Sequence, residues 1–287
     1  MSFSLSHPAS VADAVALAQQ LGESARFIAG GTDLIIQINR RRCAPTHLID
    51  LNCLSELSGI EEGAEGFSIG ALTTHKDVER HPAFQKALAA LSEAARVVGG
   101  HQIRNMGTVG GNIVNASPAA DLVPPLLALE AELTLSGPDG ARRVRLEDFL
   151  LGPGRTARRP GELLSRIAFR ALPPQSATAF IKAGRRKAME ISVVCVAARL
   201  TLGDHGCRDV RIALGAVGGT ALRAHAAEQL LEGNPPSAEL FREAGRLAMQ
   251  VCAPISDVRA SARYRSLLVE ALVPRALERC LARIEAG

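Results

Sequence analysis

The chain has 287 residues, of which 47% are hydrophobic and 22% are charged, an ordinary composition for a globular protein that allows two or three domains. Its net charge of +4 is spread over short arginine groups, such as Arg158-Arg159, that we expect to be solvated, and the chain has one Tyr and no Trp. Nucleic-acid binding favours a basic stripe with stacking aromatic side chains, so we expect no nucleic-acid partner. No apolar run approaches the roughly 18 residues of a transmembrane helix, and the first residues lack a signal-peptide pattern, so we expect a cytoplasmic protein without a membrane span.

The six cysteines form no C-x-x-C pair and no close group with histidine. Zinc and iron–sulfur sites usually draw their ligands from such spacings. A disulfide framework is not expected in a cytosolic protein. We therefore expect buried free thiols and no metal in this chain.

Residues 1–56 are predicted to alternate helices and strands in a β-α-β layout. Ser10 and Asp13 resemble a capping box, and Gly22 is a helix stop. The expected elements are a helix between Ser10 and Gly22, a strand at 25–29, a short helix at 34–40 and a strand at 47–51.

The strand at 25–29 leads into a first glycine loop, Ala29-Gly30-Gly31-Thr32-Asp33-Leu34. Glycine permits positive φ and lets backbone amides approach a ligand, and consecutive amides in such a turn can bind an anion. A single Gly-Gly pair also occurs in ordinary tight turns. This loop alone is weak evidence for a ligand site.

Residues 57–171 are predicted to form a second unit. The expected elements are a turn at 61–66, a strand at 67–69, a helix at 84–98, strands at 132–135 and 142–146 around a turn at 138–140, and a strand at 163–169. Thr73 and Thr74 fit either a helix N-cap or a ligand contact.

A second glycine-rich stretch, residues 104–129, combines small and polar residues ahead of an apolar run. We expect positive φ at Gly107, Gly110 and Gly111, and hydrogen bonds from neighbouring polar side chains. Asp121 either caps the helix that begins near Pro124 or contacts the ligand. Two glycine loops suggest one extended anionic ligand, such as a dinucleotide, although neither G-x-G-x-x-G nor a P-loop motif is present.

Residues 172–176 are a Pro-stiffened linker, after which a new domain is expected. The predicted elements are antiparallel strands at 178–183, 191–202 and 208–217, and helices at 222–231, 238–251 and 261–284. Strands followed by helices favour an α+β fold.

Three ordered motifs resemble those of a known family: AGGTDL at 29–34, GALTTH at 70–75 and RNMGTVGGNIVNASPAADL at 104–122. They are similar to the FAD-binding (medium) subunit of the molybdenum hydroxylases, of the xanthine dehydrogenase and carbon monoxide dehydrogenase type. The resemblance continues through GELLSRI at 161–167 and FIKAGRRKAMEISVV at 180–194. It implies a two-subdomain FAD-binding fold of the PCMH type at 1–56 and 57–171, followed by a C-terminal α+β domain at 177–287.

The resemblance also implies the cofactor and partners. FAD would bind non-covalently, with its pyrophosphate held by both glycine loops. Molybdopterin and [2Fe-2S] clusters would lie in a large and a small partner subunit, in a dimer of heterotrimers. The residues that it assigns to FAD are Phe27, Ile28, Ala29, Gly30, Gly31, Thr32, Asp33, Leu34, Thr74, Thr108, Val109, Gly110, Gly111, Asn112, Asp121, Leu163 and Lys182.

The sequence shows no G-x-S-x-G elbow, no H-E-x-x-H motif and no distinctive pair of carboxylates. We expect no catalytic residues of its own, because a flavin carries its own redox chemistry. The main hypothesis is an electron-transfer subunit that takes electrons from an iron–sulfur subunit and passes them to an external acceptor. The alternatives are a stand-alone flavin oxidoreductase with its own substrate site, and a binding or assembly protein whose glycine loops are structural.

Overall fold

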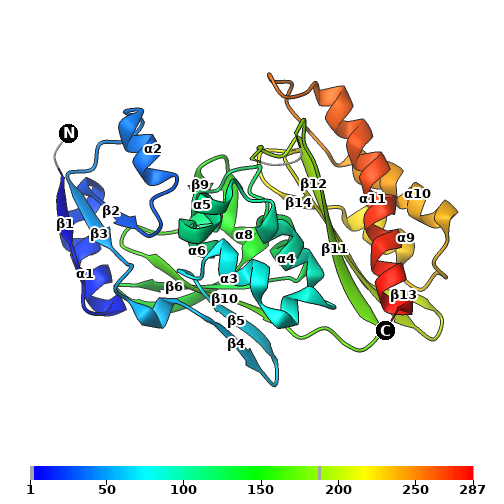
Figure 1. The fold of residues 1–287 in the computed structure, drawn as a ribbon, viewed down its shortest axis with the longest axis horizontal. Coiled ribbons are helices and arrows are strands. Elements are labelled where there is room, and N and C mark those ends of the chain that lie inside the picture. Colours follow the sequence, from blue (N-terminus) through cyan, green and yellow to red (C-terminus); the bar gives the residue numbers. More distant parts are fainter. Residues whose placement is uncertain (1–2, 187–188, 287) are drawn as a thin grey trace.

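The computed structural model describes residues 3–186 and 189–286. Figure 1 shows three structural units that follow one another along the long axis, from the N-terminal strands to the C-terminal helices. Each unit contains its own sheet. The fold is mixed α+β, as predicted, and no helix in the described ranges is long and apolar enough to cross a bilayer.

The N-terminal unit is a three-stranded parallel sheet in the order β1-β3-β2, which confirms the predicted β-α-β layout. The Ser10 side chain accepts a hydrogen bond from the Asp13 amide at the start of the first helix, and Gly22 ends it with φ of 56°. The elements are β1 (Ser4–Ser6), α1 (Val11–Leu21), the 3-10 helix η1 (Gly22–Ser24), β2 (Ala25–Ile28), α2 (Leu34–Asn39), β3 (His47–Asp50) and η2 (Ser55–Leu57).

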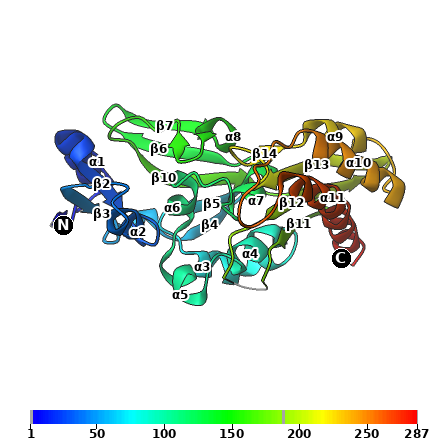
Figure 2. The ribbon, with the colours of Figure 1, turned by 90° about the horizontal axis from the view of Figure 1, so that it is seen from above.

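The middle unit is a five-stranded antiparallel sheet in the order β4-β5-β10-β6-β7, with α3, α4 and α5 on one side of it (Figure 2). Phe67, Phe84 and Phe169 pack together in its core. Its elements are β4 (Ile60–Gly63), β5 (Gly66–Gly70), α3 (His75–Arg80), η3 (Pro82–Gln85), α4 (Ala89–Arg96), α5 (His101–Met106), α6 (Val109–Val114), α7 (Val123–Ala128), β6 (Glu132–Gly137), β7 (Gly140–Arg145), α8 (Leu146–Phe149), β8 (Leu150–Gly152), β9 (Arg155–Thr156) and β10 (Leu163–Arg170).

The helix predicted at 84–98 is wrong at its start. Residues 82–85 form a 3-10 turn, and Lys86 has the non-helical dihedral angles φ −116° and ψ −118°, so the α-helix begins only at Ala89. Phe84 and Leu88 are nevertheless buried in the same core as this helix. Because these buried residues are apolar, their spacing in the sequence resembles the buried face of a longer helix.

The C-terminal unit is an antiparallel sheet in the order β11-β12-β13-β14, and both of its faces are buried. Along β12, Cys195 and Ala197 belong to the core of the middle unit, whereas Val196 and Ala198 face the C-terminal helices. A strand covered on both faces needs no polar alternation, which explains the apolar run from Val194 to Ala198 in its first half. The elements are β11 (Ser176–Ala183), β12 (Val194–Gly203), β13 (Gly206–Gly215), β14 (Leu222–Arg223), α9 (His225–Leu231), α10 (Ala238–Gln250) and α11 (Ala262–Glu285).

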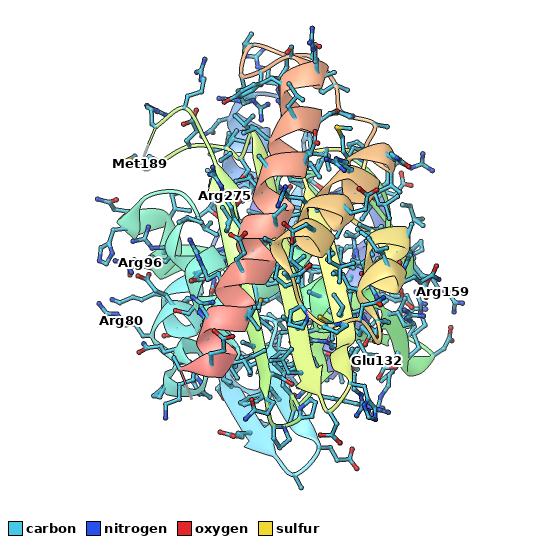
Figure 3. The ribbon with its side chains drawn as sticks, turned by 90° about the vertical axis from the view of Figure 1, so that its right-hand side faces the viewer. Arg80, Arg96, Glu132, Arg159, Met189 and Arg275 are labelled. Carbon is cyan, nitrogen blue, oxygen red and sulfur yellow. The ribbon has the colours of Figure 1, made fainter. Side chains whose placement is uncertain are left out.

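Two predicted boundaries in this unit are wrong. Residues 222–223 do not begin a helix, because they pair with β13 as β14 before α9 begins at His225. The second strand begins at Val194 rather than at residue 191. Figure 3 shows α11 lying across the outer face of the sheet beside α9 and α10.

Candidate cofactor site

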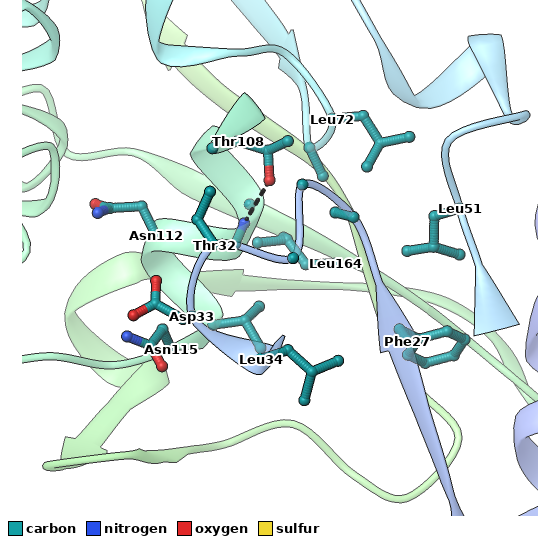
Figure 4. Close-up of a pocket in the computed structure, with 18 of the residues that line it drawn as sticks. Phe27, Thr32, Asp33, Leu34, Leu51, Leu72, Thr108, Asn112, Asn115 and Leu164 are labelled. Atoms are coloured by element: carbon teal, nitrogen blue, oxygen red, sulfur yellow. Dashed lines mark hydrogen bonds between the residues drawn. The ribbon is translucent and has the colours of Figure 1, made fainter. Parts of the chain in front are cut away.

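A pocket of about 410 Å³ lies between the first glycine loop, helices α5 and α6, and the start of β10. This volume is within the range of small-molecule and cofactor sites. In Figure 4, Phe27 and Leu51 stand at one end of the pocket, and the polar side chains of Asp33, Asn112 and Asn115 gather at the other.

The first glycine loop presents unpaired backbone amides to this pocket. Gly31 has φ of 68°, as expected for a glycine turn. Within the described part of the chain, the amides of residues 30–34 donate no hydrogen bond. A run of free amides next to a glycine in the left-handed region is suited to an anion such as a pyrophosphate.

The second glycine stretch differs from the prediction. Gly107, Gly110 and Gly111 are not among the glycines with positive φ. The Val109 and Gly110 amides donate to the Thr73 and Ala71 carbonyls at 2.9 and 2.8 Å, and the Gly111 amide donates to Thr108 Oγ1 at 3.1 Å. These amides are therefore already used within the protein, and the stretch contributes a capped short helix rather than an amide nest.

Close packing explains the glycines at 30 and 110. A Cβ atom at Gly30 would overlap the Met106 carbonyl group, and one at Gly110 would lie 2.7 Å from the Ala71 Cβ. Glycine at position 30 lets the first loop approach the end of α5, and glycine at position 110 lets α6 approach the residue that follows β5. The pocket walls are thus set by backbone contacts.

Several polar atoms that line the pocket have no partner. Nδ1 of His75, Oδ1 of Asn112 and Nε of Arg158 are buried without a hydrogen bond in the described residues. Leaving a buried polar group unpaired is unfavourable by about 1–3 kcal/mol. A polar ligand can satisfy such atoms, so the lining fits an extended polar cofactor such as FAD.

Burial shifts the pKa values of three ionisable side chains that line the pocket. Burial, followed by the charge of Arg104, lowers the pKa of His75 to about 4, so this imidazole is neutral at pH 7. Burial and the neighbouring guanidinium of Arg26 lower the pKa of Arg158. Burial raises the pKa of Asp33. Two neighbouring guanidinium groups in the lining of a pocket favour an anionic or electron-rich ligand.

Twelve of the seventeen predicted site residues line this pocket. They are Phe27, Ala29, Gly30, Gly31, Thr32, Asp33, Leu34, Thr108, Gly110, Gly111, Asn112 and Leu163. Ile28, Thr74, Val109, Asp121 and Lys182 are not part of its lining.

Thr74 is the N-cap of α3. Its side chain accepts a hydrogen bond from the Asp77 amide, while the Asp77 carboxylate accepts one from the Thr74 amide. Of the two alternatives for Thr74, a helix N-cap or a ligand contact, the structure therefore shows the N-cap. Val109 is buried in the core of the middle unit.

Asp121 and Lys182 form a buried ion pair beyond the pocket edge. Lys182 Nζ lies 2.7 Å from Asp121 Oδ2 and donates to the Val97 carbonyl at 3.1 Å, and Ser192 donates to the Asp121 carboxylate. Burial raises the pKa of Asp121, and Lys182 and Ser192 oppose this effect. Asp121 does not cap α7, whose N-cap is Leu122. Val98, next to the Lys182 contact, lines the pocket.

Sequence reasoning missed several lining residues. Arg158 was predicted to be solvated, yet it lines the pocket and its Nε is buried. His75 also lines the pocket. It belongs to the GALTTH motif but was not among the predicted site residues. No local pattern marks either side chain, because long-range packing buries both. The other lining residues outside the seventeen predicted site residues are Arg26, Gln37, Leu51, Leu57, Ala71, Leu72, Val98, Ile103, Gly107, Val114, Asn115, Gly154, Glu162 and Leu164.

Comparisons with known proteins identify the family of this chain. Residues 1–170 match the family described as "FAD binding domain in molybdopterin dehydrogenase", and residues 179–280 match "CO dehydrogenase flavoprotein C-terminal domain". The chain is 36% identical over 282 residues to the carbon monoxide dehydrogenase medium chain of Afipia carboxidovorans, covering 98% of each chain. It is 33% identical over 279 residues to the xanthine dehydrogenase FAD-binding subunit of Escherichia coli O157:H7, covering 96% of this chain and 94% of that one.

The likeness extends to three dimensions. A solved structure of the carbon monoxide dehydrogenase from Hydrogenophaga pseudoflava that lacks the Mo-pyranopterin moiety superimposes with a TM-score of 0.95 at 35% identity. The match covers 99% of this chain and 98% of that chain. The fold and the pocket thus define a flavin-binding component of a molybdenum oxidoreductase. The chain belongs to the FAD-binding medium subunits of the carbon monoxide dehydrogenase and xanthine dehydrogenase type.

Proposed function

We propose that this chain is the electron-transfer subunit of a heterotrimeric molybdenum hydroxylase. It takes electrons from an iron–sulfur subunit and passes them through FAD to an external acceptor. FAD, when bound, supplies the redox chemistry, and this chain binds and orients it. The observation that carries the proposal is the pocket itself, which combines free loop amides with unpartnered polar atoms.

The proposed contacts follow from the pocket lining. The free amides of residues 30–34 hold the pyrophosphate, and the side chains of Thr32, Asp33 and Asn112 bond the polar chain of the cofactor. The apolar group of Phe27, Leu51 and Leu163 packs against a ring system at the other end. Ile28, Thr74 and Val109 support the two loops from behind, and the Asp121–Lys182 pair acts at the pocket edge beside Val98.

An exposed apolar patch beside the pocket supports the proposal of a protein partner. Ile103 and Met106 are three residues apart on α5, and their side chains are 37% and 55% exposed. Met189 is 66% exposed, and its Cε would lie 3.4 Å from a Cβ placed on Gly100, at the start of the same helix. Exposed apolar patches often mark interaction surfaces. We place the iron–sulfur subunit here, next to the pocket wall formed by Ile103.

The proposed assembly is a dimer of heterotrimers in the cytoplasm, with a molybdopterin subunit as the third component. A permanent complex of this kind buries on the order of 2,000 Å² or more. Within this chain, the proposed division is 1–56 and 57–171 for the two FAD-binding subdomains and 177–287 for the C-terminal domain.

Reduction of the flavin tests the proposal. We expect dithionite to reduce FAD in the isolated chain, whereas aldehydes, purines and other candidate substrates reduce it only after the partner subunits are added. Met189→Glu should weaken assembly and leave FAD affinity unchanged. Rapid reduction of the isolated chain by an organic substrate would instead establish a stand-alone flavin oxidoreductase.

A further inference from the structure

A second cluster of polar side chains lies outside the pocket, at the carboxyl edge of the N-terminal sheet. Strands β1 and β3 are parallel, with Ser6 paired to Ile49, so the residues that follow them emerge side by side. These residues are His7 and Asp50. Cys53 comes from the turn after β3, and among the described residues the ligand atoms of these three side chains lie within 4.8 Å of one another.

From this geometry we propose that His7, Asp50 and Cys53 form a binding site for a divalent transition metal, with Zn²⁺ as the preferred ion. An imidazole nitrogen, a carboxylate oxygen and a thiolate are the ligand types that zinc takes in proteins. The carboxylate and the thiolate together carry two negative charges, which match the charge of the ion. A water molecule supplies the fourth ligand of a tetrahedral site.

The spacing of the ligand atoms supports this assignment. Nδ1 of His7 lies 3.3 Å from Oδ2 of Asp50. For usual zinc–nitrogen and zinc–oxygen bond lengths, two ligands of a tetrahedral zinc are about 3.3–3.5 Å apart. The pair is therefore already at ligand separation. Cys53 is exposed and lies in a turn, so a change of its side-chain rotamer can complete the site.

The carboxylate is held in place by the neighbouring asparagine. Oδ1 of Asp50 accepts hydrogen bonds from the Asn52 backbone amide at 3.0 Å and from its side-chain amide at 2.7 Å, so Oδ2 is left to face the other ligands. Metal-ligating carboxylates are usually oriented by such outer partners. Asn52 Nδ2 also donates to the Ala29 carbonyl at 3.1 Å. Metal binding here therefore stabilises the start of the first glycine loop.

No sequence motif indicates this site, because its ligands are 43 and 3 residues apart and no two of them form a metal-binding motif. The expectation of a chain without metal rested on those motifs. Parallel pairing of β1 with β3 brings the ligands together. His7 and Cys53 are exposed, which gives an ion direct access from solvent.

The test uses Co²⁺ as a spectroscopic substitute for Zn²⁺ on the chelator-treated 287-residue chain. We expect one Co²⁺ per chain, with the visible bands of a tetrahedral site, a thiolate-to-cobalt charge-transfer band, and displacement by added Zn²⁺. Cys53→Ser should remove the charge-transfer band, and His7→Ala should weaken binding. Asn52→Ala should weaken it by roughly tenfold or more.

Cys43→Ser is the matched control, because Cys43 is another accessible free cysteine of the same unit and lies outside the cluster. It should keep both the band and the affinity. Absence of stoichiometric Co²⁺ binding, or a charge-transfer band that survives in Cys53→Ser, would overturn the proposal. All readouts are independent of flavin, so their failure leaves the proposed function intact.

Discussion

At the scale of single residues, Asp121 and Lys182 were predicted to contact FAD, whereas in the structure they form an ion pair with each other. The Asp121 carboxylate is buried, the Lys182 side chain is 12% exposed, and each charge compensates the other. Breaking a buried ion pair by removing one partner is usually more harmful than replacing both, because the remaining charge is left without compensation. The same residues can therefore determine both stability and cofactor binding, and a double substitution separates the two effects.

We expect Asp121→Ala to destabilise the flavin-free chain by about 3–5 kcal/mol, because the Lys182 ammonium is left buried and unpaired. Combining it with Lys182→Met should recover much of this loss in urea unfolding. If the pair also holds the cofactor, FAD affinity falls by about tenfold or more in the double variant, since a hydrogen bond to a charged group contributes about 1.5–3 kcal/mol. A double variant with the affinity of the unchanged chain would show that the pair is structural only.

His75 predicts a dependence of stability on pH. Its folded pKa of about 4 lies below the ordinary histidine value of 6.5, so the unfolded chain binds more protons and stability falls as the pH falls from about 6.5 to about 4. Between pH 7 and pH 5 this one group should contribute a loss of about 2 kcal/mol. Urea unfolding at both pH values should show this loss, and His75→Gln should reduce it.

His101→Gln is the control for this experiment, because His101 is an exposed histidine of the neighbouring helix. It should keep the pH dependence of the unchanged chain. An equal pH dependence in His75→Gln would mean that other groups account for it.

At the scale of structural elements, local patterns predicted the positions of the glycine loops and most helices and strands. The spacing of apolar residues and the helix caps at Ser10 and Gly22 carry this information within a few residues. Long-range contacts were not predictable in the same way. Gly110 faces Ala71, 39 residues earlier in the chain, and Lys182 reaches Asp121 across 61 residues. The sequence therefore located the glycines of the site correctly but gave the wrong reason for Gly110.

Contact between the first loop and α5 leads to a prediction at Gly30. In Gly30→Ala the new methyl group overlaps the Met106 carbonyl, and backbone on both sides must move apart. Overpacking of this kind usually destabilises a protein by about 1–3 kcal/mol. Because the same two segments form the pocket walls, we expect FAD affinity to fall by more than tenfold, as measured by fluorescence titration of the flavin.

Gly63→Ala provides the comparison. Gly63 lies in β4, and its added Cβ would be 3.9 Å from the Gly66 carbonyl oxygen, an ordinary van der Waals contact. This variant should bind FAD as the unchanged chain does. Normal flavin binding by Gly30→Ala would show that the two loops can separate without loss of the site.

At the scale of the whole molecule, charged groups connect the middle unit to the C-terminal sheet. Glu130, in the turn after α7, lies 3.0 Å from Arg211, 3.1 Å from Arg199 and 3.2 Å from Arg223. These three arginines come from β13, β12 and β14. One carboxylate thus contacts three successive strands of the sheet, while apolar residues of β12 complete the core of the middle unit.

This arrangement predicts sensitivity to acid. Burial favours the neutral form of Glu130, but the hydrogen bond from Arg211 and the charges of Arg211, Arg199 and Arg223 lower its pKa to about 2. Since the folded pKa lies below the ordinary glutamate value of 4.5, the stabilisation is present above about pH 4.5 and is lost as the pH falls towards 2. We expect Glu130→Gln to lower the stability at pH 7 by about 2 kcal/mol, the usual range for a hydrogen bond to a charged group.

The measurement is thermal unfolding of the chain and of Glu130→Gln between pH 7 and pH 3. The difference between the two should shrink as the pH falls, because acid neutralises the carboxylate that the substitution removes. Glu239→Gln is a suitable control, since Glu239 pairs only with Arg242 on the exposed face of α10 among the described residues. A Glu130→Gln variant as stable as the unchanged chain at pH 7 would show that apolar packing alone joins the two units.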